Sequence, residues 1–89
     1  MSGSNDASEA TQAVSLHSLK PGQRARIRHI GLQGSVAERL LEMGLTPKTP
    51  ITLQGKTLFG GVVHCWLRGF KLSLQRELAQ HIHVEPEAK

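Results

Sequence analysis

The stretch Ser35–Leu45, with the sequence SVAERLLEMGL, predicts one short helix with both of its ends marked. Ser35 and Glu38 have the S-x-x-E spacing of a capping box, in which the serine hydroxyl accepts from the backbone N–H of Glu38 and the carboxylate reaches back to the N–H of Ser35. At the other end, Gly44 stands where a left-handed C-terminal cap would lie, and Pro47 prevents the helix from continuing. We therefore expect a capped helix over about residues 35–43.

This helix needs a packing partner. Val36, Leu40 and Met43 recur at i, i+4 and i+7 and so share one face. A helix of about two and a half turns is not stable alone in water, so this face is expected to pack against the rest of the chain. Leu41 lies about 120° from the centre of that face. It is therefore either at the rim of the core or an exposed apolar contact.

The rest of the chain reads as short strands, because apolar and polar residues alternate in it. In the first strand, Arg24, Arg26 and Arg28 share a solvated face, and Ile30 breaks the alternation, which predicts a bulge near Arg28–His29. In the fourth strand, Phe70 alternates in step with the residues expected in the core, so it is expected to face the same side as they do. The five expected strands cover residues 23–30, 51–54, 62–67, 70–75 and 82–84.

These elements predict one small, mainly β domain. The chain has 89 residues, which is enough for a single core. Five short strands, one capped helix and a short second helical turn near residues 76–80 favour a strongly bent, partly open barrel. We expect residues 1–13 to be a disordered tail, residues 14–85 to form the domain, and residues 86–89 to fray.

Several motifs in their order along the chain resemble the FeoA family. The resemblance covers residues 16–85, and its most specific part is the Arg-Leu-x-x-Met-Gly-Leu core of the helix. The motifs are Leu19-x-Pro21-Gly22, Ala25-x-Ile27, Arg39-Leu40-x-Glu42-Met43-Gly44-Leu45-x-Pro47, Gly69-x-x-Leu72-x-Leu74 and Ile82-x-Val84.

The resemblance implies an SH3-like β-barrel and a small cytoplasmic accessory protein of bacterial ferrous iron uptake. It further implies action on FeoB, a membrane transporter with a cytoplasmic GTPase domain. A related SH3-like domain also closes some iron-dependent repressors. The family commonly has Gly after Pro47, where this chain has Lys48, so a turn that needs positive φ would be strained here.

Catalysis and a resident cofactor are not expected. The sequence has no recognisable Ser/His/Asp set, no glycine-rich phosphate loop and no paired carboxylates in a pocket signature. His81 and His83 share one side of a strand, whereas His64 and Cys65 point to opposite sides. Since structural zinc sites need four ligands and open ones three, we expect no dedicated metal site. A metal shared between two copies needs fewer ligands from each, so a weak or metal-bridged homo-oligomer stays open.

The charge distribution points to a contact surface. The whole chain carries +4, and Asp6 and Glu9 are the only charges before Ser15, so subtracting their −2 leaves +6 for the remainder. Such a body suits an acidic partner. Aromatic residues make up only 3%, which is thin for base stacking, so we expect no nucleic acid. No apolar run approaches the length of a membrane span, so we expect no membrane insertion.

Two hypotheses follow. In the first, the chain binds the cytoplasmic, GTPase-bearing part of a FeoB-type transporter. Its alternative is a metal- or nucleic-acid-linked regulatory domain related to the C-terminal domain of iron-dependent repressors, for which the sequence lacks a helix-turn-helix. The candidate partner-binding residues are Arg24, Arg26, Arg28, Arg39 and Leu41.

Overall fold

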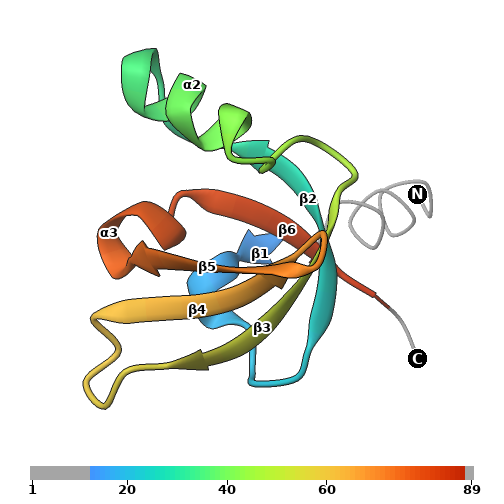
Figure 1. Cartoon of the computed structure of the whole chain (residues 1–89), viewed down its shortest axis with the longest axis vertical. Coiled ribbons are helices and arrows are strands. Elements are labelled where there is room, and N and C mark those ends of the chain that lie inside the picture. The colour runs from blue at the N-terminus through green and yellow to red at the C-terminus, as the bar shows by residue number, and fades with distance from the viewer. Residues whose placement is uncertain (1–12, 88–89) are drawn as a thin grey trace, which may run out of the picture.

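The computed structural model describes residues 13–87 as one antiparallel sheet that bends into a partly open barrel, with two short helices (Figure 1). The sheet order is β1-β6-β2-β3-β4-β5. The elements in chain order are β1 (Val14–Ser15), the 3-10 helix η1 (Leu16–Ser18), β2 (Arg24–Ile30), α2 (Gly34–Glu42), β3 (Pro50–Lys56), β4 (Val62–Leu67), β5 (Phe70–Gln75), α3 (Arg76–Ala79) and β6 (Ile82–Pro86). The expected mainly β class and the second helical turn are confirmed.

The sheet has six strands within the described chain, not the five expected. The additional strand, β1, is only two residues long and pairs with β6 through Val14 and Val84. A two-residue strand has no alternation to detect, which explains why the sequence does not reveal it. The bulge expected in β2 is present, because the pairing with β6 shifts register between Ile27 and His29.

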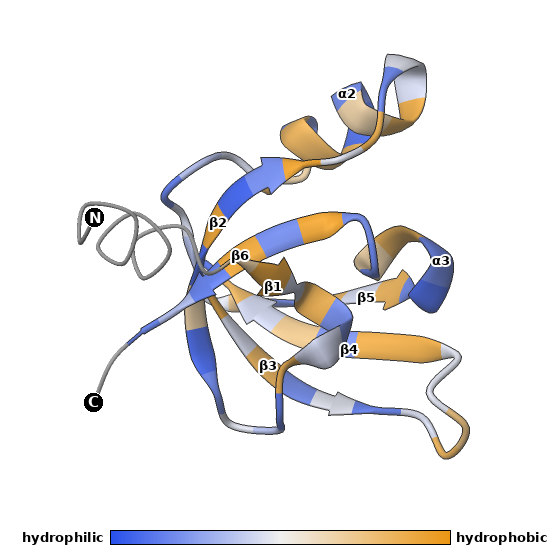
Figure 2. Cartoon of the chain, turned by 180° about the vertical axis from the view of Figure 1, so that it is seen from behind, coloured by the Kyte–Doolittle hydropathy of each residue, from blue (hydrophilic) through white to orange (hydrophobic). Residues whose placement is uncertain are grey.

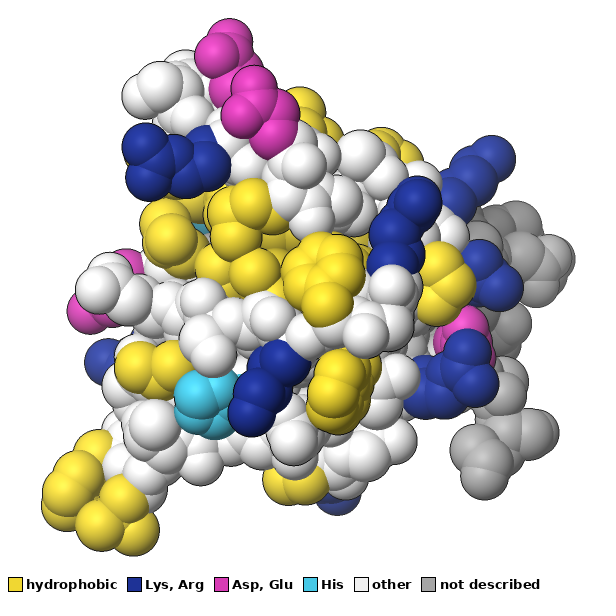
Figure 3. All heavy atoms as spheres, viewed as in Figure 1, with side chains coloured by type: hydrophobic (Ala, Val, Ile, Leu, Met, Phe, Trp, Pro, Cys, Tyr) yellow, Lys and Arg dark blue, Asp and Glu magenta, His cyan; other side chains and the backbone are white. Residues whose placement is uncertain are grey.

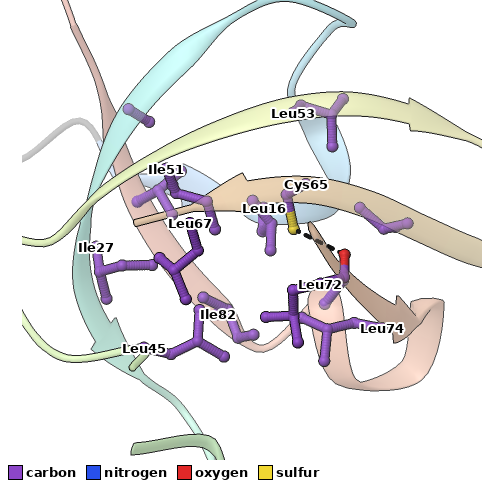
Figure 4. Packing of buried hydrophobic residues seen from close by; sticks show 14 of the residues in the cluster. Leu16, Ile27, Leu45, Ile51, Leu53, Cys65, Leu67, Leu72, Leu74 and Ile82 are labelled. Atoms are coloured by element: carbon purple, nitrogen blue, oxygen red, sulfur yellow. Dashed lines mark hydrogen bonds between the residues drawn. The ribbon is translucent and has the colours of Figure 1, made fainter. Parts of the chain in front are cut away.

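The core is formed by the inward side of every long strand, as the alternating hydropathy in Figure 2 shows. Its fully buried large side chains come from η1 and the residue that follows it, from β2, β3, β4 and β6, and from the loop after α2 (Figure 4). These side chains are Leu16, Leu19, Ile27, Leu45, Ile51, Leu53, Val63, Cys65, Leu67, Ile82 and Val84. Burial of this many aliphatic groups is the main stabilising contribution to a domain of this size.

The prediction of a capping box is wrong. The helix already begins at Gly34, with Gln33 as its N-cap, and no side chain caps it. Ser35 therefore lies inside the first turn, where its hydroxyl cannot occupy the cap position. Gly34 adopts φ +74°, a conformation that lets the chain turn into the helix one residue earlier than expected.

Two apolar residues are more exposed than the sequence pattern predicts. Val36 is exposed, although it shares the periodic face of Leu40, and Phe70 is exposed, although it has core parity. Val36 lies in the first turn of α2, and Phe70 is the first residue of β5, so both stand near the start of their elements.

At the C-terminus, the structure continues β6 through Pro86, which pairs with Ala25, and the N–H of Glu87 donates to the carbonyl of Arg24 at 3.0 Å. The expected fray thus does not begin at Pro86. Of the expected disordered tail, residues 1–13, the structure describes only Ala13, and residues 1–12 and 88–89 lie outside the described residues.

Candidate functional site

The C-terminal end of α2 is held firmly to the barrel. The N–H of Gly44 donates to the carbonyl of Leu41 at 3.0 Å, and the N–H of Leu45 donates to the carbonyl of Leu40 at 3.1 Å. With Gly44 at φ +106°, these two bonds form a Schellman motif. Leu40 and Leu45 are both buried, so the motif fixes the direction in which α2 leaves the core.

The rest of α2 stands away from the barrel (Figure 1). Of residues 34–42, all of which the structure describes, only Leu40 is buried and only Ala37 is half-buried. A helix this short depends on tertiary packing for its stability. Its first two turns therefore present side chains that the domain itself does not cover.

A groove of about 250 Å³ lies between α2 and α3, and we call it the α2 groove. Its lining is mainly apolar, with one guanidinium at its edge. The lining residues are Ser35, Val36, Arg39, Leu40 and Leu78. Leu78 was not singled out by the sequence.

Hydrophobic side chains continue from the α2 groove over the adjacent face of the barrel (Figure 3). Trp66 of β4 and Phe70 of β5 are each 44% exposed, as is Val36. Surface apolar residues that occur singly are ordinary, but residues gathered beside a groove are typical of contact surfaces.

The three arginines of β2 form the expected row, but they are paired within the chain. Arg24 and Arg26 share the carboxylate of Glu87, with Nε–O distances of 3.6 and 3.5 Å. Arg28 donates from Nη1 to Glu85 Oε2 at 2.6 Å. The two carboxylates offset part of the charge that the sequence assigns to this strand face.

The structure therefore separates the predicted partner-binding residues. Arg39 lines the α2 groove, whereas Arg24, Arg26 and Arg28 lie along β2 beside β6. Leu41 is 42% exposed, which makes it an exposed apolar residue of α2 and not a core residue. It lies about 140° around the helix from Val36, so the two side chains occupy different sides of α2.

Two histidines stack on each other, and a third is hydrogen-bonded to a serine. The rings of His29 and His83 stack with centroids 4.5 Å apart, and His64 Nδ1 is hydrogen-bonded to Ser73 Oγ at 2.8 Å. Burial, followed by the charges of His29 and His81, lowers the pKa of His83. Among residues 13–87, no group of three or more His, Cys, Asp or Glu side chains is arranged to hold a metal ion.

Cys65 is a core residue. Its Sγ donates to the carbonyl of Leu72 at 3.7 Å (Figure 4), and burial raises its pKa to about 11. Its thiol is thus kept protonated, which disfavours both nucleophilic and metal-binding chemistry.

The turn after α2 carries the strain expected at Lys48. This residue adopts φ +73°, where a side chain is unfavourable. Backbone bonds to Ile27 hold it there, with Lys48 N–H donating at 2.7 Å and Thr49 accepting at 2.9 Å from the Ile27 N–H.

Comparison with known proteins places these features in a family. The model of the FeoA domain matches residues 14–86. The FeoA-like protein of Clostridium acetobutylicum is 26% identical, with a TM-score of 0.77 over 86% of this chain and 90% of that one. No curated protein matches the sequence.

Two more distant structures share the fold. Stenotrophomonas maltophilia FeoA complexed with zinc, described as a prokaryotic SH3 domain protein, is 18% identical, with a TM-score of 0.73 over 82% of this chain and 91% of that one. A manganese-dependent transcriptional repressor is 17% identical, with a TM-score of 0.77 over 84% of this chain and 37% of the repressor. The family match spans nearly the whole described domain, so this chain belongs to the FeoA family, which is related to ferrous iron transport.

Proposed function

We propose that this chain is an accessory protein of bacterial ferrous iron uptake that acts by binding the cytoplasmic, GTPase-bearing part of a FeoB-type transporter. The observation that carries the proposal is the α2 groove, an apolar hollow on a helix that the domain leaves largely uncovered. The family membership supplies the transport context. The residues supply the mode of action, which is contact.

The contact centres on α2. Val36 and Leu78 provide apolar area on the groove side, Leu41 provides it on the other side, and Arg39 adds a charge at the edge. Small transient interfaces combine a few apolar anchors with a polar, charged rim. A partner segment that clasps the first two turns of α2 would bury both sides of the helix.

The β2 arginines act at longer range. Three arginines facing two carboxylates leave a net charge of +1 on that strip, so the structure supports weaker steering than the bare row suggests. Arg24→Glu/Arg26→Glu should therefore lower the association rate, and the effect should shrink at high salt.

Surface plasmon resonance against the soluble domain of the transporter tests the proposal. Val36→Ser and Leu41→Gln should each speed dissociation, because truncating an anchor acts mainly on the off-rate. Leu58→Ser is the matched control, since it removes an exposed leucine far from α2. If both α2 variants bind like the wild type while they remain folded, the contact lies elsewhere; if the wild type does not bind at all, the proposed function is wrong.

The repressor-like alternative is not favoured by any contact in the described residues. The likeness to the manganese-dependent repressor, at 17% identity, concerns the fold alone.

A further inference from the structure

Leu58 and Phe59 form the tip of the β3–β4 hairpin, and their side chains are 88% and 89% exposed. The other exposed large hydrophobic side chains of the described chain are at most 44% exposed. Both tip residues are central residues of the turn Thr57–Gly60, which the N–H of Gly60 closes by donating to the carbonyl of Thr57 at 2.8 Å. Such positions usually hold Gly, Pro, Asn, Asp or Ser, so a Leu-Phe pair runs against turn chemistry.

The backbone at the base of the tip is already hydrogen-bonded. Thr57 N–H donates to the carbonyl of Val62 at 3.0 Å, and Val62 N–H donates to Thr57 Oγ1 at 3.1 Å. The carbonyl of Gly61 accepts from the N–H of Arg76 at 3.0 Å. Paired backbone groups lower the cost of moving a loop out of water, because unpaired ones would lose their hydration.

Two cations lie behind the tip. Lys56 is the last residue of β3. Arg76 is the first residue of α3, and its backbone N–H donates to the carbonyl of Gly61. Burial, then the charges of Lys56 and Arg76, lower the pKa of His17, whose Nε2 would lie 3.7 Å from a Cβ added at Gly60. Lys56 directly precedes the turn, and the backbone N–H of Arg76 is hydrogen-bonded to Gly61, so both residues flank the base of the hairpin, with Glu77 following Arg76 in the chain.

We propose that this hairpin is a contact with an anionic lipid bilayer. Leu58 and Phe59 enter the boundary between headgroups and acyl chains, while Lys56 and Arg76 lie at the level of the lipid phosphates. Interfacial anchors combine Phe or Leu with Lys or Arg in this way. A protein partner is less suited to this shape, because interface anchors lie within a broader packed patch, whereas these two side chains are almost fully exposed at the tip of a hairpin.

This contact differs from the expectation of no membrane insertion, which concerned spanning segments. No helix in residues 13–87 has the length and hydropathy to span a bilayer. The proposed contact requires no spanning helix, because only the hairpin tip enters the bilayer surface. The contact also fits the rest of the molecule, since the hairpin tip and α2 lie toward opposite ends of its longest axis (Figure 1). A domain that rests on the bilayer by its hairpin leaves the α2 groove facing away from the lipid.

The test is sedimentation of the full chain with vesicles that contain no transporter, so it is independent of the proposed partner. Vesicles of phosphatidylcholine with about 30 mol% phosphatidylglycerol supply the anionic surface, and pure phosphatidylcholine supplies the neutral one. We expect salt-sensitive binding to the anionic vesicles and a loss of at least about tenfold for Leu58→Ser/Phe59→Ser. Leu41→Gln, an exposed leucine at the other end, should bind like the wild type.

A second measurement reports the position of the tip. In a Trp66→Phe background, Phe59→Trp places the only tryptophan at the hairpin, and its emission should shift to the blue and be quenched by brominated lipid. The native Trp66, near the far end of β4, should show neither effect. Equal vesicle binding by the wild type and Leu58→Ser/Phe59→Ser would overturn the proposal. So would a tip variant that loses only a dimer on size-exclusion chromatography, since the tip would then contact a second copy.

Discussion

The backbone N–H of Leu45 donates to the carbonyl of Leu40 across 3.1 Å, and both leucines are buried. This relationship joins the one buried turn of α2 to the core and leaves the preceding turns outside it. The proposed contact surface of the domain thus depends on how the helix ends. Gly44, which lies directly before Leu45, permits that ending.

Replacing Gly44 with Ala should destabilise the domain by at least about 1 kcal/mol. The residue adopts φ +106°, and an added Cβ would lie 3.3 Å from Leu67 Cδ2. Urea denaturation measures the loss. Gly55→Ala is the matched control, because a Cβ there meets nothing within 4 Å, and it should not lower stability. Equal midpoints for the two variants would contradict the cap assignment.

Replacing Lys48 with Gly should stabilise the domain by about 0.5–1 kcal/mol, since glycine adopts φ +73° without steric strain but adds entropy to the unfolded chain. The thermal midpoint should rise. Lys20→Gly removes the same charge and side chain at an exposed turn and should give no increase. A lower midpoint for Lys48→Gly would show that its side chain contributes more than its backbone conformation costs.

Replacing Glu87 with Gln should change stability by no more than about 1 kcal/mol, because the pairs with Arg24 and Arg26 are largely solvent-exposed. It should, however, raise the association rate with an acidic partner, since one carboxylate no longer offsets two guanidinium groups. Stopped-flow or surface plasmon resonance at two salt concentrations checks this. An unchanged rate would remove the β2 face from the encounter.

Cys65 should react slowly with an aromatic disulfide reagent at pH 8 and quickly once urea unfolds the chain. Burial raises its pKa to about 11 from an ordinary value of 9.0, so the folded state holds the proton more tightly. This contribution to stability is fully present below pH 9 and is lost as pH rises toward 11. Fast reaction of the native protein would mean that β4 opens readily.

The sequence predicts where the helices and strands lie better than it predicts which neighbours cover or pair with their side chains. The alternation in β2 and β5 and the signals at Gly44 and Pro47 are local, so they place strands and the helix end correctly. The exposure of Val36 is not local, because periodicity identifies a helix face without showing how much of it a neighbour covers. The pairing of Arg24 with Glu87 depends on β2 lying beside β6, an order that strand alternation does not specify.

On the candidate surface, too, the sequence identifies single residues but not the groove that they form. Leu41 and Arg39 can be named from the sequence, since helix geometry gives their direction. The α2 groove cannot, because Leu78 reaches it from α3, far along the chain.

Chemical-shift mapping tests the central claim most directly. The isotope-labelled chain, at 9.7 kDa, is titrated with the soluble, GTPase-bearing part of a FeoB-type transporter, and its amide signals are followed. The account predicts that the largest perturbations cluster at residues 34–42 and at Leu78, with residues 57–61 unchanged. Binding that perturbs the hairpin or the strand faces while leaving α2 unaffected would contradict it, and so would the absence of any perturbation at saturating partner.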